Sequence, residues 1–140
     1  METAIDIAAR PAAVWDELID FATYPDWNPF ICRLSGEASV GARLAVTVQP
    51  PGRRAVTFKP TVLAATPGRE LRWLGRTVLP GLLDGEHGFV LEPKAGGCRL
   101  RQQETFSGLL VPLLSDLLAD TERGFIDMNQ ALKHRIENRC

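Results

Sequence analysis

Residues 11–30 of this 140-residue chain read Pro-Ala-Ala-Val-Trp-Asp-Glu-Leu-Ile-Asp-Phe-Ala-Thr-Tyr-Pro-Asp-Trp-Asn-Pro-Phe, and this stretch decides the fold. Pro11 suits the first turn of a helix, where its missing N–H leaves no hydrogen bond unmade. Apolar side chains then recur at helical spacing, at Val14, Trp15, Leu18 and Ile19. The Tyr24-Pro25 step ends any regular helix, because a residue before proline is pushed out of the α region. The stretch therefore predicts an amphipathic helix that leads into a compact aromatic turn.

A short alternating run, Ala4–Ile7, precedes this helix and predicts a strand. The succession of strand, proline-led helix with Val-Trp, then Asp-Phe, Tyr-Pro and Trp-Asn-Pro-Phe resembles the opening of the START-like helix-grip (SRPBCC) superfamily. Within that superfamily it is similar to the polyketide cyclase/dehydrase and lipid-transport branch. The resemblance implies a sheet and a long C-terminal helix that enclose an apolar pocket. It also implies one of three roles, since relatives act as ligand carriers, cyclases or dehydratases, and chaperone-binding partners.

After Phe30 the pattern changes from helical to alternating, which predicts strands. The expected segments are 31–37, 44–48, 56–64, 71–76, 89–91 and 100–106. Pro60 argues for an edge position or a bulge in the third of these, because proline cannot donate to a ladder of hydrogen bonds. The connections are of hairpin length, so the strands are expected to be antiparallel.

From Val111 onward the 3.6-residue period returns and predicts a helix of about 27 residues, or ~40 Å. Its apolar stripe comprises Leu114, Leu117, Leu118, Thr121, Phe125, Met128, Leu132 and Ile136. Gly124 inside this helix costs about 1 kcal/mol relative to alanine, which a kink or the close approach of a ligand or strand would explain. The whole pattern predicts an α+β fold, and the resemblance implies that this is the helix-grip fold, with residues 1–140 as a single ligand-binding domain. It has a seven-stranded antiparallel sheet wrapped around the long C-terminal helix, with two short helices after the first strand.

Composition excludes several classes of function. Sixteen basic residues against seventeen acidic ones give a net charge of −1, and no block of basic residues exceeds two, so no nucleic-acid partner is expected. The apolar runs are too short for stable membrane insertion, and the N-terminus lacks a signal peptide, which favours a cytoplasmic protein. Neither a metal nor another cofactor is expected. The cysteines, Cys32, Cys98 and Cys140, form no Cys-x-x-Cys pair, and the only histidines are His87 and His134.

The register of the last hairpin can be deduced from its turn at 94–97. That register pairs Leu91 with Leu100, Phe89 with Gln102, and His87 with Glu104. All six side chains share one face because strands alternate, and the apolar members must face the core. His87, Gln102 and Glu104 are therefore predicted to point inward. Since unpaired buried polar groups are costly, three of them indicate a cavity that holds water or a ligand.

The candidate site follows from these inward faces. His87 and Glu104 are the candidates for an acid/base pair, although a His–Glu pair within a core also has a purely structural interpretation. The predicted ligand-binding residues are Trp73, His87, Phe89, Gln102, Glu104, Phe106, Phe125 and Met128. Two apolar loops, Leu79–Leu83 and Leu109–Leu114, are expected near the mouth of the cavity.

The sequence favours binding of a small apolar or amphipathic molecule, lipid-, polyketide- or aromatic-like, between sheet and helix. Two alternatives stay open. One is a cyclase or dehydratase that uses His87 and Glu104 as acid and base, and the other is a chaperone-type interaction module with a filled core. A homodimer through the two apolar loops is a further option.

Overall fold

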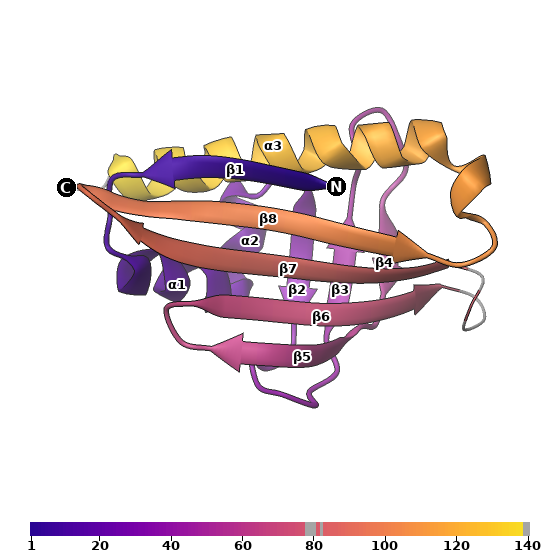
Figure 1. The fold of residues 1–140 in the computed structure, drawn as a ribbon, viewed down its shortest axis with the longest axis horizontal. Coiled ribbons are helices and arrows are strands. Elements are labelled where there is room, and N and C mark those ends of the chain that lie inside the picture. The colour runs from indigo at the N-terminus through magenta and orange to yellow at the C-terminus, as the bar shows by residue number, and fades with distance from the viewer. Residues whose placement is uncertain (78–80, 82, 139–140) are drawn as a thin grey trace.

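The computed structural model describes residues 1–77, 81 and 83–138, and its elements follow the predicted order (Figure 1). They are β1 (Glu2–Ile7), α1 (Pro11–Ile19), η1 (Phe21–Thr23), α2 (Tyr24–Trp27), β2 (Ile31–Ser35), β3 (Ala45–Val48), β4 (Val56–Phe58), β5 (Thr61–Thr66), β6 (Glu70–Thr77), β7 (Leu83–Lys94), β8 (Gly97–Ser107), η2 (Val111–Leu113) and α3 (Ser115–Glu137). Pro11 occupies the start of α1, and Val14, Trp15 and Leu18 are buried as the helical spacing predicts. Among the described residues, no helix is both long and apolar enough to cross a membrane.

The strands form two antiparallel sheets. Five of them have the order β1-β8-β7-β6-β5, and the other three have the order β2-β3-β4. In Figure 1 the larger sheet lies in front, the smaller one crosses behind it, and α3 runs along the upper edge beside β1. This arrangement confirms the α+β helix-grip fold with a long C-terminal helix and two short helices after the first strand.

The strand count differs from the seven expected. The segment 56–64 was predicted as one strand, but it is interrupted at Lys59-Pro60 and forms β4 and β5, so the described residues form eight strands. Proline lacks the N–H that a continuous ladder needs at this point. Its carbonyl instead accepts a hydrogen bond from the N–H of Leu44 at 2.9 Å, and an Arg43–Thr61 bridge resumes the pairing.

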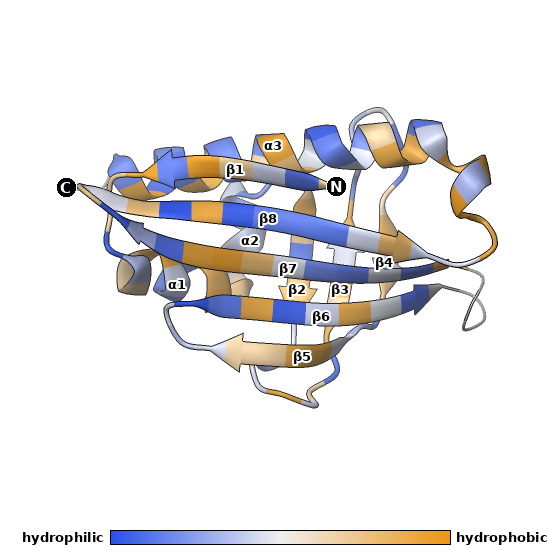
Figure 2. Cartoon of the chain, in the orientation of Figure 1, coloured by the Kyte–Doolittle hydropathy of each residue, from blue (hydrophilic) through white to orange (hydrophobic). Residues whose placement is uncertain are grey.

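The register predicted for the last hairpin is confirmed. Leu91 pairs with Leu100, Phe89 with Gln102, and His87 with Glu104 across β7 and β8. Figure 2 shows the resulting alternation of hydrophilic and hydrophobic residues along part of β8. The inward members are buried, with Phe89, Leu100 and Gln102 each 0% exposed. The hairpin thus presents its polar pair, His87 and Glu104, to the interior.

The apolar stripe of α3 is divided between two environments. Phe125, Met128 and Leu132 are fully buried in the core, whereas Leu117 and Leu118 nearer the start of the helix are only half-buried. The helix begins at Ser115 rather than Val111, because Val111–Leu113 form a 3₁₀ turn. The first two turns of α3 therefore do not complete the packed core.

Gly124 marks the boundary between these two parts. An added Cβ at this position would lie 2.3 Å from Cδ1 of Phe30, the buried residue directly before β2. The Phe30 ring also meets Phe125 edge to face, with a centroid separation of 5.4 Å. Of the explanations open for Gly124, the close approach of another element is the one observed, and the approaching group is an aromatic side chain.

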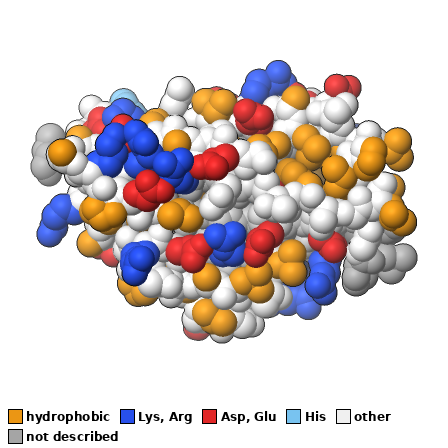
Figure 3. Space-filling view, viewed as in Figure 1, with side chains coloured by type: hydrophobic (Ala, Val, Ile, Leu, Met, Phe, Trp, Pro, Cys, Tyr) orange, Lys and Arg blue, Asp and Glu red, His pale blue; other side chains and the backbone are white. Residues whose placement is uncertain are grey.

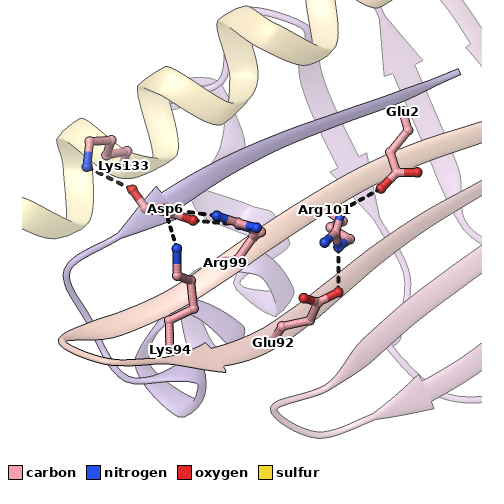
Figure 4. Close-up of polar contacts among 7 residues, drawn as sticks. All are labelled: Glu2, Asp6, Glu92, Lys94, Arg99, Arg101 and Lys133. Atoms are coloured by element: carbon pink, nitrogen blue, oxygen red, sulfur yellow. Dashed lines mark hydrogen bonds and ion pairs between the residues drawn. The ribbon is translucent and has the colours of Figure 1, made fainter.

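A network of ion pairs and hydrogen bonds on the outer surface connects β1, β7, β8 and α3 (Figure 4). Asp6 on β1 accepts hydrogen bonds from Arg99 and Lys94, each at 2.8 Å. Those contacts hold the pKa of Asp6 well below its usual range. In the same way, Lys133 and the Ala8 N–H lower the pKa of Glu137, which joins the end of α3 to the segment after β1.

We expect the stability of the protein to fall as the pH drops below about 4, the ordinary pKa of carboxyl groups in unfolded chains. A carboxyl whose pKa is lowered by folding contributes stability above its unfolded pKa and loses it as the pH falls through the folded one. Asp6→Asn should lower the Tm at pH 7 and make the curve of Tm against pH shallower. Calorimetry from pH 7 to pH 2 measures this. Glu37→Gln, in an exposed loop, is the control, and an equal effect from it would contradict the assignment.

Candidate functional site

A cavity of about 460 Å³ lies between the start of α3 and the concave faces of the two sheets. The helix contributes Leu117, Leu118 and Thr121 to its wall, and Leu114, directly before the helix, is also part of it. The smaller sheet contributes apolar side chains from all three of its strands, namely Ile31, Val48, Val56 and Phe58. The half of the α3 stripe that is not fully buried is therefore the half that faces this space.

Two glycines explain why the cavity lies at this end of the larger sheet. Gly75 on β6 and Gly85 on β7 are directly opposite each other, and both are on the cavity wall. Because side chains alternate along strands, Gly75 and Gly85 lie on the same inward face as Trp73 and His87. A glycine has no side chain, so this part of the face leaves space in front of the sheet. Farther along, the same face carries Leu71, Phe89 and Leu91, which fill the space beneath the second half of α3.

His87 and Glu104 meet at the inner wall of this cavity. His87 Nδ1 lies 2.9 Å from Glu104 Oε1, and the two side chains are 5% and 11% exposed. In the tautomer that carries its proton on Nδ1, the imidazole donates to Glu104, and the other ring nitrogen, Nε2, carries the lone pair. Nε2 is buried and has no hydrogen-bond partner among the described residues. An imidazole held in this tautomer can accept a proton at Nε2.

Aromatic rings fix the position of the His87 imidazole. The ring stacks on Trp73 with a centroid distance of 5.1 Å and an interplanar angle of 14°. Phe89 and Phe125 approach it at 4.7 and 4.9 Å. The pair is therefore rigid and largely shielded from water, which strengthens its electrostatic interactions.

Gln102, the third inward polar residue, has a different role. Its Nε2 donates to Asn129 Oδ1 at 2.7 Å, and Asn129 Nδ2 donates to Thr3 Oγ1 at 2.9 Å. The Thr3 hydroxyl in turn donates to the carbonyl of Gln102 at 3.3 Å. This closed set of hydrogen bonds joins β8, α3 and β1 within the core.

The structure brings half of the predicted ligand-binding residues to the cavity. Trp73, His87, Glu104 and Phe106 line it. The other four, Phe89, Gln102, Phe125 and Met128, are fully buried but are not part of the wall. They lie where the inward side chains are large and α3 packs directly onto the sheet, so no space is left beside them.

The mouth of the cavity involves residues at and just before the start of the predicted strand 56–64, which were not among the predicted ligand-binding residues. Arg53, Arg54 and Val56, between and within β3 and β4, line the cavity and are exposed. Arg53 Nε donates to Asp120 Oδ2 at 2.7 Å, which connects this hairpin to α3 and lowers the pKa of Asp120. A Pro-Pro-Gly-Arg-Arg sequence is an ordinary solvated turn by composition, so nothing in it indicated a cavity.

The two apolar loops reach the cavity at one described residue each. Leu83 and Leu114, at their ends, line the cavity. Leu79, Pro80 and Leu82 lie outside the described residues. Leu109 and Leu113 are 79% and 77% exposed. Figure 3 shows hydrophobic side chains gathered at the end of the molecule where η2 joins α3. Within residues 1–77, 81 and 83–138, no group of three His, Cys, Asp or Glu side chains is placed to hold a metal ion.

Comparisons with known proteins agree with this fold. The family model for polyketide cyclase/dehydrase and lipid transport proteins matches residues 1–137. A crystal structure of a protein from Mesorhizobium loti is similar, with 19% identity, a TM-score of 0.78, and coverage of 100% of this chain and 98% of that one. No curated protein sequence matches the chain.

Two further solved structures share the fold. A di-domain ARO/CYC protein from the BE-7585A biosynthetic pathway has 13% identity and a TM-score of 0.81, and the match covers 100% of this chain and 50% of that one. Norcoclaurine synthase from Thalictrum flavum, solved with a transition-state analogue, has 15% identity and a TM-score of 0.74 over 97% and 92% of the two chains. At these identities the likeness concerns the fold alone.

Proposed function

The chain belongs to the polyketide cyclase/dehydrase and lipid transport family, and from this premise we propose that it binds a small apolar or amphipathic molecule in the cavity beneath α3. The cavity of about 460 Å³ carries the proposal. Small-molecule sites range over roughly 300–1,000 Å³ and combine apolar walls with a few placed polar groups. The walls here are mostly aliphatic and aromatic, and the inner polar group is the His87–Glu104 pair. These features suit a lipid-, polyketide- or aromatic-like ligand held by one ligand-binding domain over residues 1–140.

Leu118→Trp should abolish uptake of the neutral fluorescent probe N-phenyl-1-naphthylamine. Leu118 is half-buried on the cavity wall, so an indole at this position would occupy the space that the probe needs. The wild-type protein should enhance the probe's fluorescence with saturable binding, whereas the variant should show at least about a tenfold loss of affinity, or ~1.4 kcal/mol. Its unfolding midpoint in urea should stay close to that of the wild type, because the added volume has space to fill.

Ala119→Trp is the matched control, since Ala119 is exposed on the same helix and is not part of the cavity wall. It should bind the probe like the wild type. The proposal fails if the wild type does not bind the probe, or if the two tryptophan variants bind it equally well.

The His87–Glu104 pair favours one alternative, an enzyme of cyclase or dehydratase type. A buried imidazole with one nitrogen on a carboxylate and the other unpartnered is equipped to accept a proton from a bound carbonyl compound. Polyketide-type cyclisation and dehydration both need such a transfer. Turnover of a β-hydroxy carbonyl compound that is lost in His87→Asn, with probe binding retained, would favour this alternative over binding alone.

The remaining expectations about partners and location are part of the same proposal. A chaperone-type interaction module would be favoured by a filled core, and the observed cavity supports ligand binding instead. We propose a cytoplasmic protein without a nucleic-acid partner, supported by the net charge of −1 and the short basic runs. The exposed leucines Leu109 and Leu113 support a homodimer, which light scattering of Leu109→Ser would test.

A further inference from the structure

We propose that the ligand of this cavity is an amphipathic acid with a hydroxyl group at its apolar end. Its acid group pairs with Arg54 at the mouth, and its hydroxyl donates to Glu104 at the inner wall. This inference rests on the proposed ligand binding and adds the chemical class of the ligand and its direction in the cavity.

Arg54 is the cation available to a ligand at the mouth. It lines the cavity and is exposed, and within the described part of the chain its side chain has no ion pair or hydrogen bond. Its neighbour Arg53 also lines the cavity but is already paired with Asp120 at 2.7 Å. A guanidinium offers two parallel N–H groups that match a carboxylate, so a free arginine at an apolar mouth selects an acid.

Glu104 sets the opposite requirement at the inner wall. Its Oε1 is taken by His87, and no hydrogen bond from the described residues reaches its Oε2. Oε2 lies 2.9 Å from the position that a Cβ of Gly85 would occupy. Since glycine has no side chain, Oε2 packs against the Gly85 backbone at the cavity wall. An ionised carboxylate only accepts hydrogen bonds. It therefore favours a hydroxyl or phenol at this end and repels an acid group, which orients the ligand.

The distance between the Arg54 and Glu104 side chains limits the length of the ligand. Phe58 reaches the larger sheet, where its ring lies 3.1 Å from the Cβ position of Gly75, directly opposite Gly85. Arg54 precedes Phe58 by four residues, which is about 13 Å of extended chain at most. Because both polar side chains reach into the cavity, a molecule with its acid and hydroxyl groups roughly 10 Å apart can contact both. Two fused aromatic rings substituted at opposite ends have this length.

Calorimetric titration of three matched naphthalenes tests the proposal. These are 6-hydroxy-2-naphthoate, which has both groups, 2-naphthoate, which lacks the hydroxyl, and 2-naphthol, which lacks the acid. The compound with both groups should bind about tenfold more tightly than either of the others, since a charge-assisted hydrogen bond contributes on that order. Added salt should weaken binding of the two acids and leave 2-naphthol nearly unchanged, because Arg54 is solvent-exposed.

Substitutions assign each end of the ligand. Arg54→Gln should weaken both acids about tenfold and 2-naphthol less than twofold, while Arg54→Lys should be intermediate because it keeps the charge but loses the planar fork. Arg33→Gln, at an exposed site on β2 away from the cavity, should change none of them. Glu104→Gln can still accept from His87, and it should reduce the advantage of 6-hydroxy-2-naphthoate over 2-naphthoate.

The possible failures are distinguishable. If N-phenyl-1-naphthylamine binds but the three naphthalenes bind equally or not at all, or if Arg54→Gln has no selective effect, the ligand class is wrong and the binding proposal stands. A hydroxyl advantage that persists in Glu104→Gln overturns the assigned direction. If neither the neutral probe nor any naphthalene binds, both proposals are wrong.

Discussion

Gly97→Ala should lower the free energy of unfolding by about 4 kcal/mol, which places it among the largest effects of a single substitution. Gly97 begins β8, and an added Cβ would lie 2.0 Å from the carbonyl oxygen of Ile7 and 3.0 Å from its carbonyl carbon. A side chain could rotate away from such a contact, but backbone cannot. The end of β1 would have to move off β8, which would break the Ile7–Cys98 and Asp6–Arg99 pairs.

Urea unfolding followed by tryptophan fluorescence measures this loss. Gly88→Ala is the matched control on the neighbouring strand, since its Cβ would meet only the side chains of Arg72 and Gln103, each at 3.5 Å. That is an ordinary contact, and we expect a change within about 0.5 kcal/mol. A Gly97→Ala protein as stable as Gly88→Ala would show that β1 does not pack as the structure has it.

His87→Phe should destabilise the protein by about 3 kcal/mol, because it removes the hydrogen-bond donor of a largely buried carboxyl group and leaves that group without a partner. Glu104 would lose the hydrogen bond from Nδ1 while its side chain remains 11% exposed. Phenylalanine largely keeps the aromatic packing against Trp73 and Phe125. The loss of stability therefore measures the cost of leaving the Glu104 carboxyl group without its partner, not the cost of a new cavity.

A double-mutant cycle separates the pair from its parts. Glu104→Leu alone should also destabilise, since it leaves the imidazole Nδ1 without an acceptor. The double variant His87→Phe/Glu104→Leu should be more stable than the sum of the single effects by at least ~1 kcal/mol, because both polar groups are then gone. Strict additivity would mean that the two side chains do not interact in solution.

Both predictions concern the same hairpin, and its register followed from the sequence because it depends on local chemistry. The turn at Ala95-Gly96 fixes which residues face each other, and strand alternation then places every side chain on one of two faces. Burial of Leu91 and Leu100 selects the inward face. His87 and Glu104 were therefore located opposite each other without knowledge of any distant element.

At Pro60 the sequence correctly predicted a disturbance of the strand, but the disturbance is larger than predicted. An edge or bulge was expected within one strand, whereas the chain breaks there and changes sheets. The decision depends on Leu44 and Arg43, which take over the pairing from another part of the chain. Partners so far apart in sequence leave no periodic pattern in either segment.

The sequence contained an indication of the two glycines that leave space for the cavity. Gly75 and Gly85 each interrupt a run of inward residues, and a glycine within a strand is typical of close approach or of space left for another group. That the two glycines lie opposite each other could be deduced only from the register of β6 and β7. The sequence pattern does not define the length of the loop between these strands, so it does not give that register. Arg53 and Arg54 had no such signal, because charged residues in a turn are solvated by default.

The sequence by itself determined the order of elements, the α+β class, the last hairpin and the inward His87–Glu104 pair, since all of these follow from periodicity, turn residues and short-range register. The helix-grip arrangement was implied by the resemblance of residues 11–30 to a known family. Only the tertiary structure decided which inward residues touch open space. The packing of Phe30 against Gly124 divides α3 into a buried half and a cavity-lining half, which leaves Phe125 and Met128 in the core and Leu117 and Leu118 at the wall. A cavity is the volume that several distant segments fail to fill together, so no single segment encodes it.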